Sequence, residues 1–158
     1  MQPKNEIPQA ELFRSRLEQI IDLTHPLCKL SHQIDWSVFE REFGRLYVEK
    51  QGRPGKPIRL LVGLHYLKHM TNCSDEVAVN TFVENPYWQY FCGMEHFAHT
   101  LPLNPTTLVK WRRRVGAQGM ERLLAETPAT ARRTGQMRAD EIVRVNVDTT
   151  VQPLRALI

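Results

Sequence analysis

The stretch NPTTLVKWRRRVG (residues 104–116) predicts the clearest helix in the chain. Asn104 can cap the first turn, Pro105 suits the first helical position because that position needs no N–H donor, and Gly116 is typical of a helix end. The apolar residues that would face a core recur three or four positions apart: Leu108, Trp111 and Val115. This segment therefore predicts an amphipathic helix whose other faces meet solvent.

Basic residues crowd this helix and the segment after it. From Pro105 to Arg138 the chain has eight basic and two acidic residues, a net charge of +6, whereas the whole chain carries only +4. Concentrated positive charge is typical of proteins that bind a polyanion, most often nucleic acid, and the alternative is a solvated basic face. We expect the DNA-binding residues to be these: Thr106, Thr107, Lys110, Arg112, Arg113 and Arg114.

Helical periodicity also dominates the rest of the first 132 residues. EKQGRPGKP (49–57) predicts a loop, because two glycines and two prolines interrupt any regular element. The other predicted helices are one that opens after Pro8 with the stripe Phe13, Leu17, Ile20, Ile21 and Thr24, one capped by Asp35, one from residue 57 or 58 to about 71, one capped by Ser74, a short aromatic one over 86–94, and one from 119 to about 132.

The period changes only near the C-terminus. Three valines alternate with polar residues in IVRVNVDTT (142–150), and this period of two in β-branched residues predicts a strand. The expected fold class is mainly α, a multi-helix bundle with a helix-turn-helix-like portion, followed by a single C-terminal β-strand. We expect an N-terminal helical arm at 1–33, a helical domain at 34–132, a linker at 133–141 and the strand at 142–158.

Two groups of side chains have the chemistry of metal ligands: His65, His69 and Cys73, and Cys92, His96 and His99. In the first group the outer residues would lie about 12 Å apart along a helix, so all three cannot reach one ion. Histidines on a helix flank and buried thiols are the favoured interpretation. Three scattered cysteines also favour reduced thiols over a disulfide framework.

Four blocks together resemble bacterial insertion-sequence transposases of the InsH-like DDE class: IDWSVFEREFGRLY (34–47), GRPGKPIRLLVGLHYLKHMTNCSDEVAVNTFVENPYWQYFCGM (52–94), LPLNPTTLVKWRRRVG (101–116) and RVNVDTTVQ (144–152). The resemblance implies that the helical domain binds the terminal inverted repeats of the element, as double-stranded DNA. It also implies that the strand is the first of an RNase H-like catalytic domain. Asp148 matches the first acid of the DDE triad, a catalytic residue and metal ligand, and Mg²⁺ is the cofactor of a complete site.

No residue of this chain matches the second Asp or the Glu of the triad, and PLRALI (153–158) departs from the family pattern. The expected product is an N-terminal transposase fragment, truncated within the catalytic domain and catalytically incomplete by itself. Full-length transposase or a second copy of the chain is the expected protein partner. One alternative is a subunit that supplies Asp148 to a DDE transposase completed by a second polypeptide.

A second alternative is a helical protein-interaction module built on the aromatic residues Tyr87, Trp88, Tyr90 and Phe91. Aromatic residues at this density favour a core position, because each ring buries a large area. No apolar run approaches the roughly 20 residues of a membrane span, so no membrane partner is expected. The N-terminal segment lacks the apolar centre of a signal peptide, which predicts a cytoplasmic protein.

Overall fold

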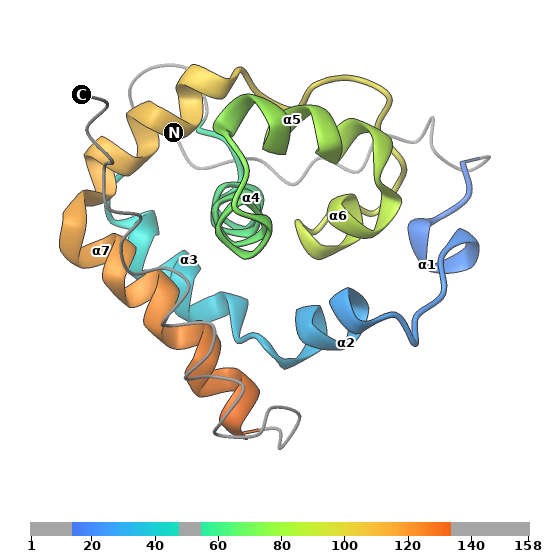
Figure 1. The fold of residues 1–158 in the computed structure, drawn as a ribbon, viewed down its shortest axis with the longest axis horizontal. Helices are drawn as coiled ribbons and strands as arrows, with labels where there is room; N and C mark the ends of the chain where they lie inside the picture. Colours follow the sequence, from blue (N-terminus) through green and yellow to red (C-terminus); the bar gives the residue numbers. More distant parts are fainter. Residues whose placement is uncertain (1–13, 48–54, 134–158) are drawn as a thin grey trace, which may run out of the picture.

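The computed structural model describes residues 14–47 and 55–133, and within these ranges all regular elements are helices (Figure 1). In chain order they are α1 (Leu17–Ile20), α2 (Pro26–Gln33), α3 (Trp36–Gly44), α4 (Ile58–Thr71), α5 (Asp75–Glu84), α6 (Pro86–Phe91) and α7 (Pro105–Arg133). The predicted mainly α class is confirmed. The predicted strand at 142–158, and the linker beyond Arg133, lie outside the described residues.

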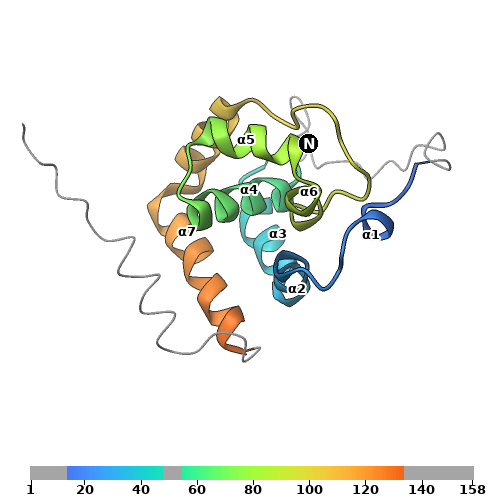
Figure 2. The ribbon, with the colours of Figure 1, turned by 45° about the vertical axis from the view of Figure 1, so that its right-hand side comes forward.

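Helix α4 is the centre of the fold and packs against α3, α5, α6 and α7 (Figures 1 and 2). A helix that is buried all round carries apolar residues on every face rather than along one stripe. The run from Leu60 to His65 is buried without interruption, and Leu67, two residues further on, is also buried. No described helix is both long enough and apolar enough to cross a membrane.

Side-chain caps set the start of the helices that surround α4. The Asp35 carboxylate accepts a hydrogen bond from the Ser37 N–H at 3.1 Å, and the Ser74 hydroxyl accepts one from the Val77 N–H at 3.2 Å. At the start of α6, Asn85 Oδ1 accepts from two backbone N–H groups, those of Tyr87 and Trp88. Each cap satisfies donors that the first helical turn leaves unpaired. The predicted capping roles of Asp35 and Ser74 are confirmed.

The predicted helix over the stripe from Phe13 to Thr24 is wrong in its described part. Only Leu17–Ile20 is helical, and α2, which we did not predict, begins at Pro26. The Asp22 carboxylate accepts bonds from the Thr24 N–H and hydroxyl at 2.8 and 2.7 Å, which makes a local turn. Such turns compete with a helix for the backbone N–H groups. A new helix can then begin at Pro26, with the His25 ring as its cap.

The aromatic helix α6 belongs to the core. Trp88, Tyr90 and Phe91 are buried, and Tyr87 is partly buried. Buried Gln89 joins this helix to the connection that leads to α7. Its amide N–H₂ donates to the carbonyls of Phe82 and Ala98 at 3.0 and 2.8 Å, and its Oε1 accepts from the Ala98 N–H at 2.7 Å. These bonds fix the path of the connection and so help to place α7.

Helix α7 is broken at Gly116, whose φ of 74° and ψ of 174° are not helical. The residue ends the first segment, as predicted, and a second helical segment follows. A Cβ at this position would meet nothing within 4 Å, so the requirement for glycine comes from the backbone conformation and not from space. This backbone region is almost confined to glycine, because other side chains collide with their own backbone there.

Gly116→Ala is therefore expected to lower the free energy of unfolding by about 1–3 kcal/mol. Gly44→Ala is the matched control, because Gly44 lies in helix α3 with only an ordinary contact, 3.8 Å from Ile58 Cδ1. That change should leave stability unchanged or raise it slightly. Urea unfolding followed by circular dichroism measures both variants. Equal stability of the two would show that the break at Gly116 imposes no strain.

Candidate nucleic-acid interface

The first half of α7 is held by a cap and a buried stripe. Asn104 Oδ1 accepts from the Thr106 N–H at 3.0 Å and from its hydroxyl at 2.9 Å, which fixes the first turn. Leu108 and Trp111 are fully enclosed, and the Trp111 ring packs edge-on against Phe43 and beside His65. With this stripe turned inward, the opposite face of the helix is turned to solvent.

Five of the six predicted DNA-binding residues share that outer face. One of them is Lys110, and each of the other four lies three or four positions from it, which places them around it on the helix surface: Thr106, Thr107, Arg113 and Arg114. Thr107 is partly buried and the other four are exposed. The structure thus brings these hydroxyls and cations onto one continuous surface.

A groove of about 770 Å³ runs beside this face, which we call the cationic groove. Its floor and walls come from the connection before α7, from α7 itself, and from the segments on either side of residues 48–54. Three cations among the described residues line it, Lys56, Lys110 and Arg114, and none of these described lining residues is a carboxylate. Lys56 is not among the predicted DNA-binding residues, because only the folded chain brings that loop residue beside α7.

Tyr47 and Trp111 form the inner part of the cationic groove. The Arg114 guanidinium lies over the Tyr47 ring, 5.3 Å from its centroid, in a cation–π arrangement. Burial raises the pKa of Tyr47, and the charge of Arg114 partly offsets this rise. Among the described residues, no hydrogen-bond acceptor is placed for the buried indole N–H of Trp111, although Tyr47 lies close to it. The groove therefore combines positive charge with an aromatic wall.

Arg112 occupies a different environment from its neighbours. It lies four residues from buried Leu108 and points across the core edge toward α5, where its two terminal nitrogens donate to the two carboxylate oxygens of Asp75 at 2.6 and 2.7 Å. Lys68 lies 3.7 Å from the same carboxylate. The hydrogen bonds from Arg112 hold the pKa of Asp75 below its usual range. The charge of Arg112 is thus already paired, and the pair joins α7 to α5.

The candidate metal ligands are dispersed in the structure. His65 is completely buried, and its Nδ1–H donates to the Leu61 carbonyl at 2.8 Å. Burial lowers the pKa of His65 to about 4, so the ring is neutral at physiological pH. His69 is exposed on the same helix, and Cys92 is buried beside α4. Among the residues that the structure describes, no three His, Cys, Asp or Glu side chains gather at one point.

Asp148, the predicted catalytic residue and Mg²⁺ ligand, lies outside the described residues. Its role stays a prediction that rests on the resemblance described above.

Sequence comparison relates the chain to one protein family and to a bacterial protein. The family described as "Transposase domain (DUF772)" matches residues 15–114, which include α1 to α6 and the first part of α7. An uncharacterized protein of Rhizobium meliloti, ORF8 in the nfe locus, is 49% identical over 143 residues, which are 90% of this chain and 69% of that protein. No solved structure matches the chain.

The Arg112–Asp75 pair should stabilise the fold. Asp75→Asn is expected to lower the free energy of unfolding at pH 7 by about 1–3 kcal/mol, because it leaves a half-buried guanidinium without its anion. The folded-state pKa of Asp75 lies below its ordinary value of 3.8. The difference in the free energy of unfolding between wild type and variant should therefore have its full value above pH 3.8. It should disappear as the pH falls through the folded-state pKa of Asp75.

Chemical unfolding at several pH values tests this. Glu76→Gln is the matched control, since Glu76 is exposed at the neighbouring position of α5. A pH-independent loss in Asp75→Asn, or an equal loss in the control, would contradict a stabilising role of the ion pair.

Proposed function

The chain belongs to the transposase domain (DUF772) family, and from this membership we propose that it acts in DNA transposition by binding double-stranded DNA through the outer face of α7 and the cationic groove. The observation that carries the proposal is the charge of the groove, whose described lining residues include three cations and no carboxylate. A surface of this kind suits a polyanion, because each bound phosphate releases condensed counterions.

The outer face of α7 also has the shape and chemistry to read a groove of DNA. An α-helix fits the major groove, and residues near its N-terminus commonly contact base edges there. The exposed Thr106 hydroxyl stands in the first turn, while Lys110, Arg113 and Arg114 follow on the same face. We assign the three cations mainly to phosphates, which position the protein, and Thr106 and Thr107 to the base edges or phosphates nearest the first turn.

The target that we propose is the terminal inverted repeat of an insertion sequence, and the enzyme class is the InsH-like DDE class. The sequence resemblance supports both, because its blocks include most of the segment from α3 to Gly116. Catalysis is a separate matter, since the one matched acid, Asp148, lies outside the described residues and no residue matches the other two. Two further carboxylates would be needed to hold two metal ions. We therefore propose DNA binding without strand cleavage for this chain acting alone.

Binding to duplex DNA should weaken steeply with salt. Four cations, Lys56, Lys110, Arg113 and Arg114, predict a slope of about −3 to −4 in a plot of log K against log salt concentration. Lys110→Gln and Arg114→Gln should each weaken binding and reduce the slope by about 1. Lys29→Gln is the control, because this lysine is exposed on α2 and does not line the cationic groove. Fluorescence anisotropy with a labelled duplex measures all four proteins, and identical slopes would refute the cationic groove as the DNA site.

Recognition of the inverted repeat is tested separately. A duplex with the terminal repeat of the encoding element should bind at least about tenfold more tightly than a scrambled duplex of equal length and composition at the same salt. Thr106→Ala should reduce this ratio more than it reduces binding to the scrambled duplex, because loss of a base contact relaxes specificity. Equal affinity for both duplexes in the wild-type protein would leave general DNA binding and exclude specific recognition by this chain.

A further inference from the structure

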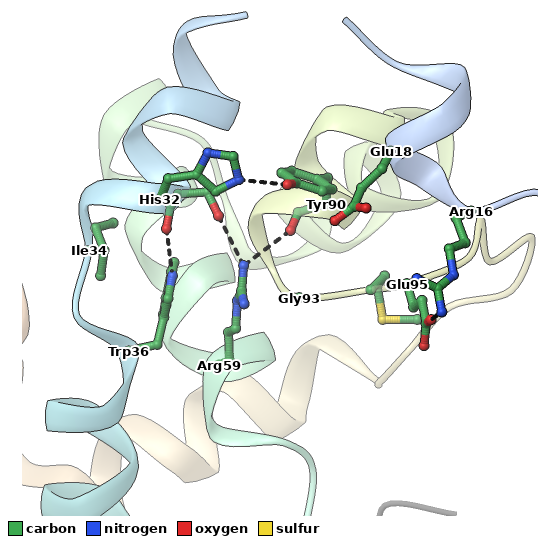
Figure 3. A pocket seen from close by; sticks show the side chains of 11 residues that line it. Arg16, Glu18, His32, Ile34, Trp36, Arg59, Tyr90, Gly93 and Glu95 are labelled. Carbon is green, nitrogen blue, oxygen red and sulfur yellow. Dashed lines mark hydrogen bonds and ion pairs between the residues drawn. The ribbon is translucent and has the colours of Figure 1, made fainter. Parts of the chain in front are cut away.

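Arg59, in the first turn of α4, carries a half-buried charge (Figure 3). Its guanidinium lies against the Trp36 ring, 4.7 Å from the centroid. Nη2 donates to the hydroxyl of buried Ser31 at 2.9 Å and weakly to the Tyr90 carbonyl at 3.5 Å, and Nε donates to the Phe91 carbonyl at 3.4 Å. Figure 3 shows the side chain standing beside Trp36 and below His32 and Tyr90. All of these partners are uncharged.

The backbone makes room for this side chain at Gly93. This glycine has a φ of 86°, and a Cβ built on it would lie 2.6 Å from Arg59 Cδ and 2.8 Å from Nε. Any other residue would therefore be strained and would displace the arginine. The position of Arg59 is held by the fold from several sides, as expected of a preorganised site and not of a side chain that happens to be trapped.

Three other arginines of the described chain differ from Arg59 in one respect. Arg112 pairs with Asp75, Arg122 with Glu42, and Arg16 with Glu95, each at 2.6 to 2.8 Å. Among the described residues, no carboxylate comes within ion-pair distance of Arg59, and its Nη1 has no acceptor. Burial lowers the pKa of this guanidinium, which shows the cost of holding its charge away from water. An anion beside Nη1 would offset that cost.

A cavity of about 490 Å³ opens beside Arg59. Its charged lining consists of two cations, Arg16 and Arg59, and two carboxylates, Glu18 and Glu95, and Arg16 and Glu95 are paired with each other at the rim. This balance contrasts with the cationic groove, where the lining residues that the structure describes include three cations and no carboxylate. A polyanion such as DNA would meet the two carboxylates, whereas one small anion can pair with Arg59 alone.

We propose that this cavity, the Arg59 pocket, binds a single carboxylate group. The Arg59 guanidinium can donate a charge-assisted hydrogen bond from Nη1 to one carboxylate oxygen, while Nη2 and Nε keep their bonds to Ser31, Tyr90 and Phe91. The His32 ring and the Tyr90 hydroxyl, joined by a hydrogen bond of 2.7 Å, stand above it as further polar partners. Ile34 and Met94 give the wall an apolar part that fits the aliphatic stem of an acid. The carboxylate can belong to a free small acid or to a Glu side chain of another protein.

Titration of the full chain with sodium acetate, and with a short peptide carrying one Glu side chain, tests the proposal at constant ionic strength. The indole N–H resonance of Trp36 reports on the pocket, and that of Trp111 reports on the cationic groove in the same spectrum. Both carboxylates should shift the Trp36 signal saturably in the millimolar range. Arg59→Gln should weaken binding at least about tenfold, while Arg41→Gln, the same change at an exposed position of α3, should not.

Glu18→Gln provides a gain of affinity that a purely structural role of Arg59 would not produce. Removing the rim carboxylate should tighten acetate binding about two- to threefold. Arg59→Lys keeps the charge but lacks the planar fork, so it should bind more weakly even if Arg59→Gln fails to fold. Tighter binding of the Glu peptide than of acetate would identify a protein partner as the source of the carboxylate, and tighter binding of acetate a free acid.

Several results would overturn the proposal. One is the absence of a saturable Trp36 shift with either carboxylate, and another is an equal shift with neutral acetamide. An affinity for acetate that is unchanged in both Arg59→Lys and Glu18→Gln would likewise show that the Arg59 pocket is not the binding site. Inorganic phosphate that binds more tightly than acetate would assign the site to phosphate chemistry instead. None of these outcomes depends on DNA binding, because the cationic groove is monitored separately through Trp111.

Discussion

The burial of α4 on all sides is the constraint from which the rest of the structure follows. Leu60 to His65 have no exposed face, so every neighbouring helix must contribute apolar side chains to cover them. Helix α7 covers part of α4 with Leu108 and Trp111. The centroid of the Trp111 ring lies 4.8 Å from the centroid of the His65 ring. This packing determines the rotation of α7 about its own axis. The face of α7 opposite Trp111 is therefore turned to solvent, and the sequence spacing decides which residues lie on that face.

The same packing separates cations that stand next to each other in the chain. Arg112 and Arg113 are consecutive, yet Arg112 turns toward Asp75 and Arg113 toward solvent. A helix advances 3.6 residues per turn, so neighbouring positions point in different directions. The ion pair with Asp75 fastens α7 to α5, and the exposed cations can then act as a rigid set. Adjacent residues of one arginine triplet thus differ in role: Arg112 pairs within the fold, and the exposed arginines belong to the proposed DNA-binding face.

Two charged regions of the molecule suit different partners for the same electrostatic reason. The cationic groove has positive charge alone, which favours a partner with many negative charges, and the transposase family is consistent with that partner being DNA. The Arg59 pocket balances its cations with Glu18 and Glu95, so it favours a partner with one charge. The aromatic helix α6 takes no part in either as an exposed surface, because Trp88 and Phe91 are needed to cover α4.

The sequence by itself determined the mainly helical class, the caps at Asp35 and Ser74, the break at Gly116 and the cationic character of α7, because these depend on contacts within a few residues. Spacing alone also places Arg112 with Leu108, four residues away, and apart from the other predicted DNA-binding residues. The short α1 and the start of α2 were missed, because a local turn at Asp22 interrupted an apolar periodicity that looked continuous. Only the tertiary structure brought Lys56 beside Lys110 and set Arg59 against Gly93 and Trp36. Those contacts join residues far apart in the chain, and they exist because α4 must be covered from every side.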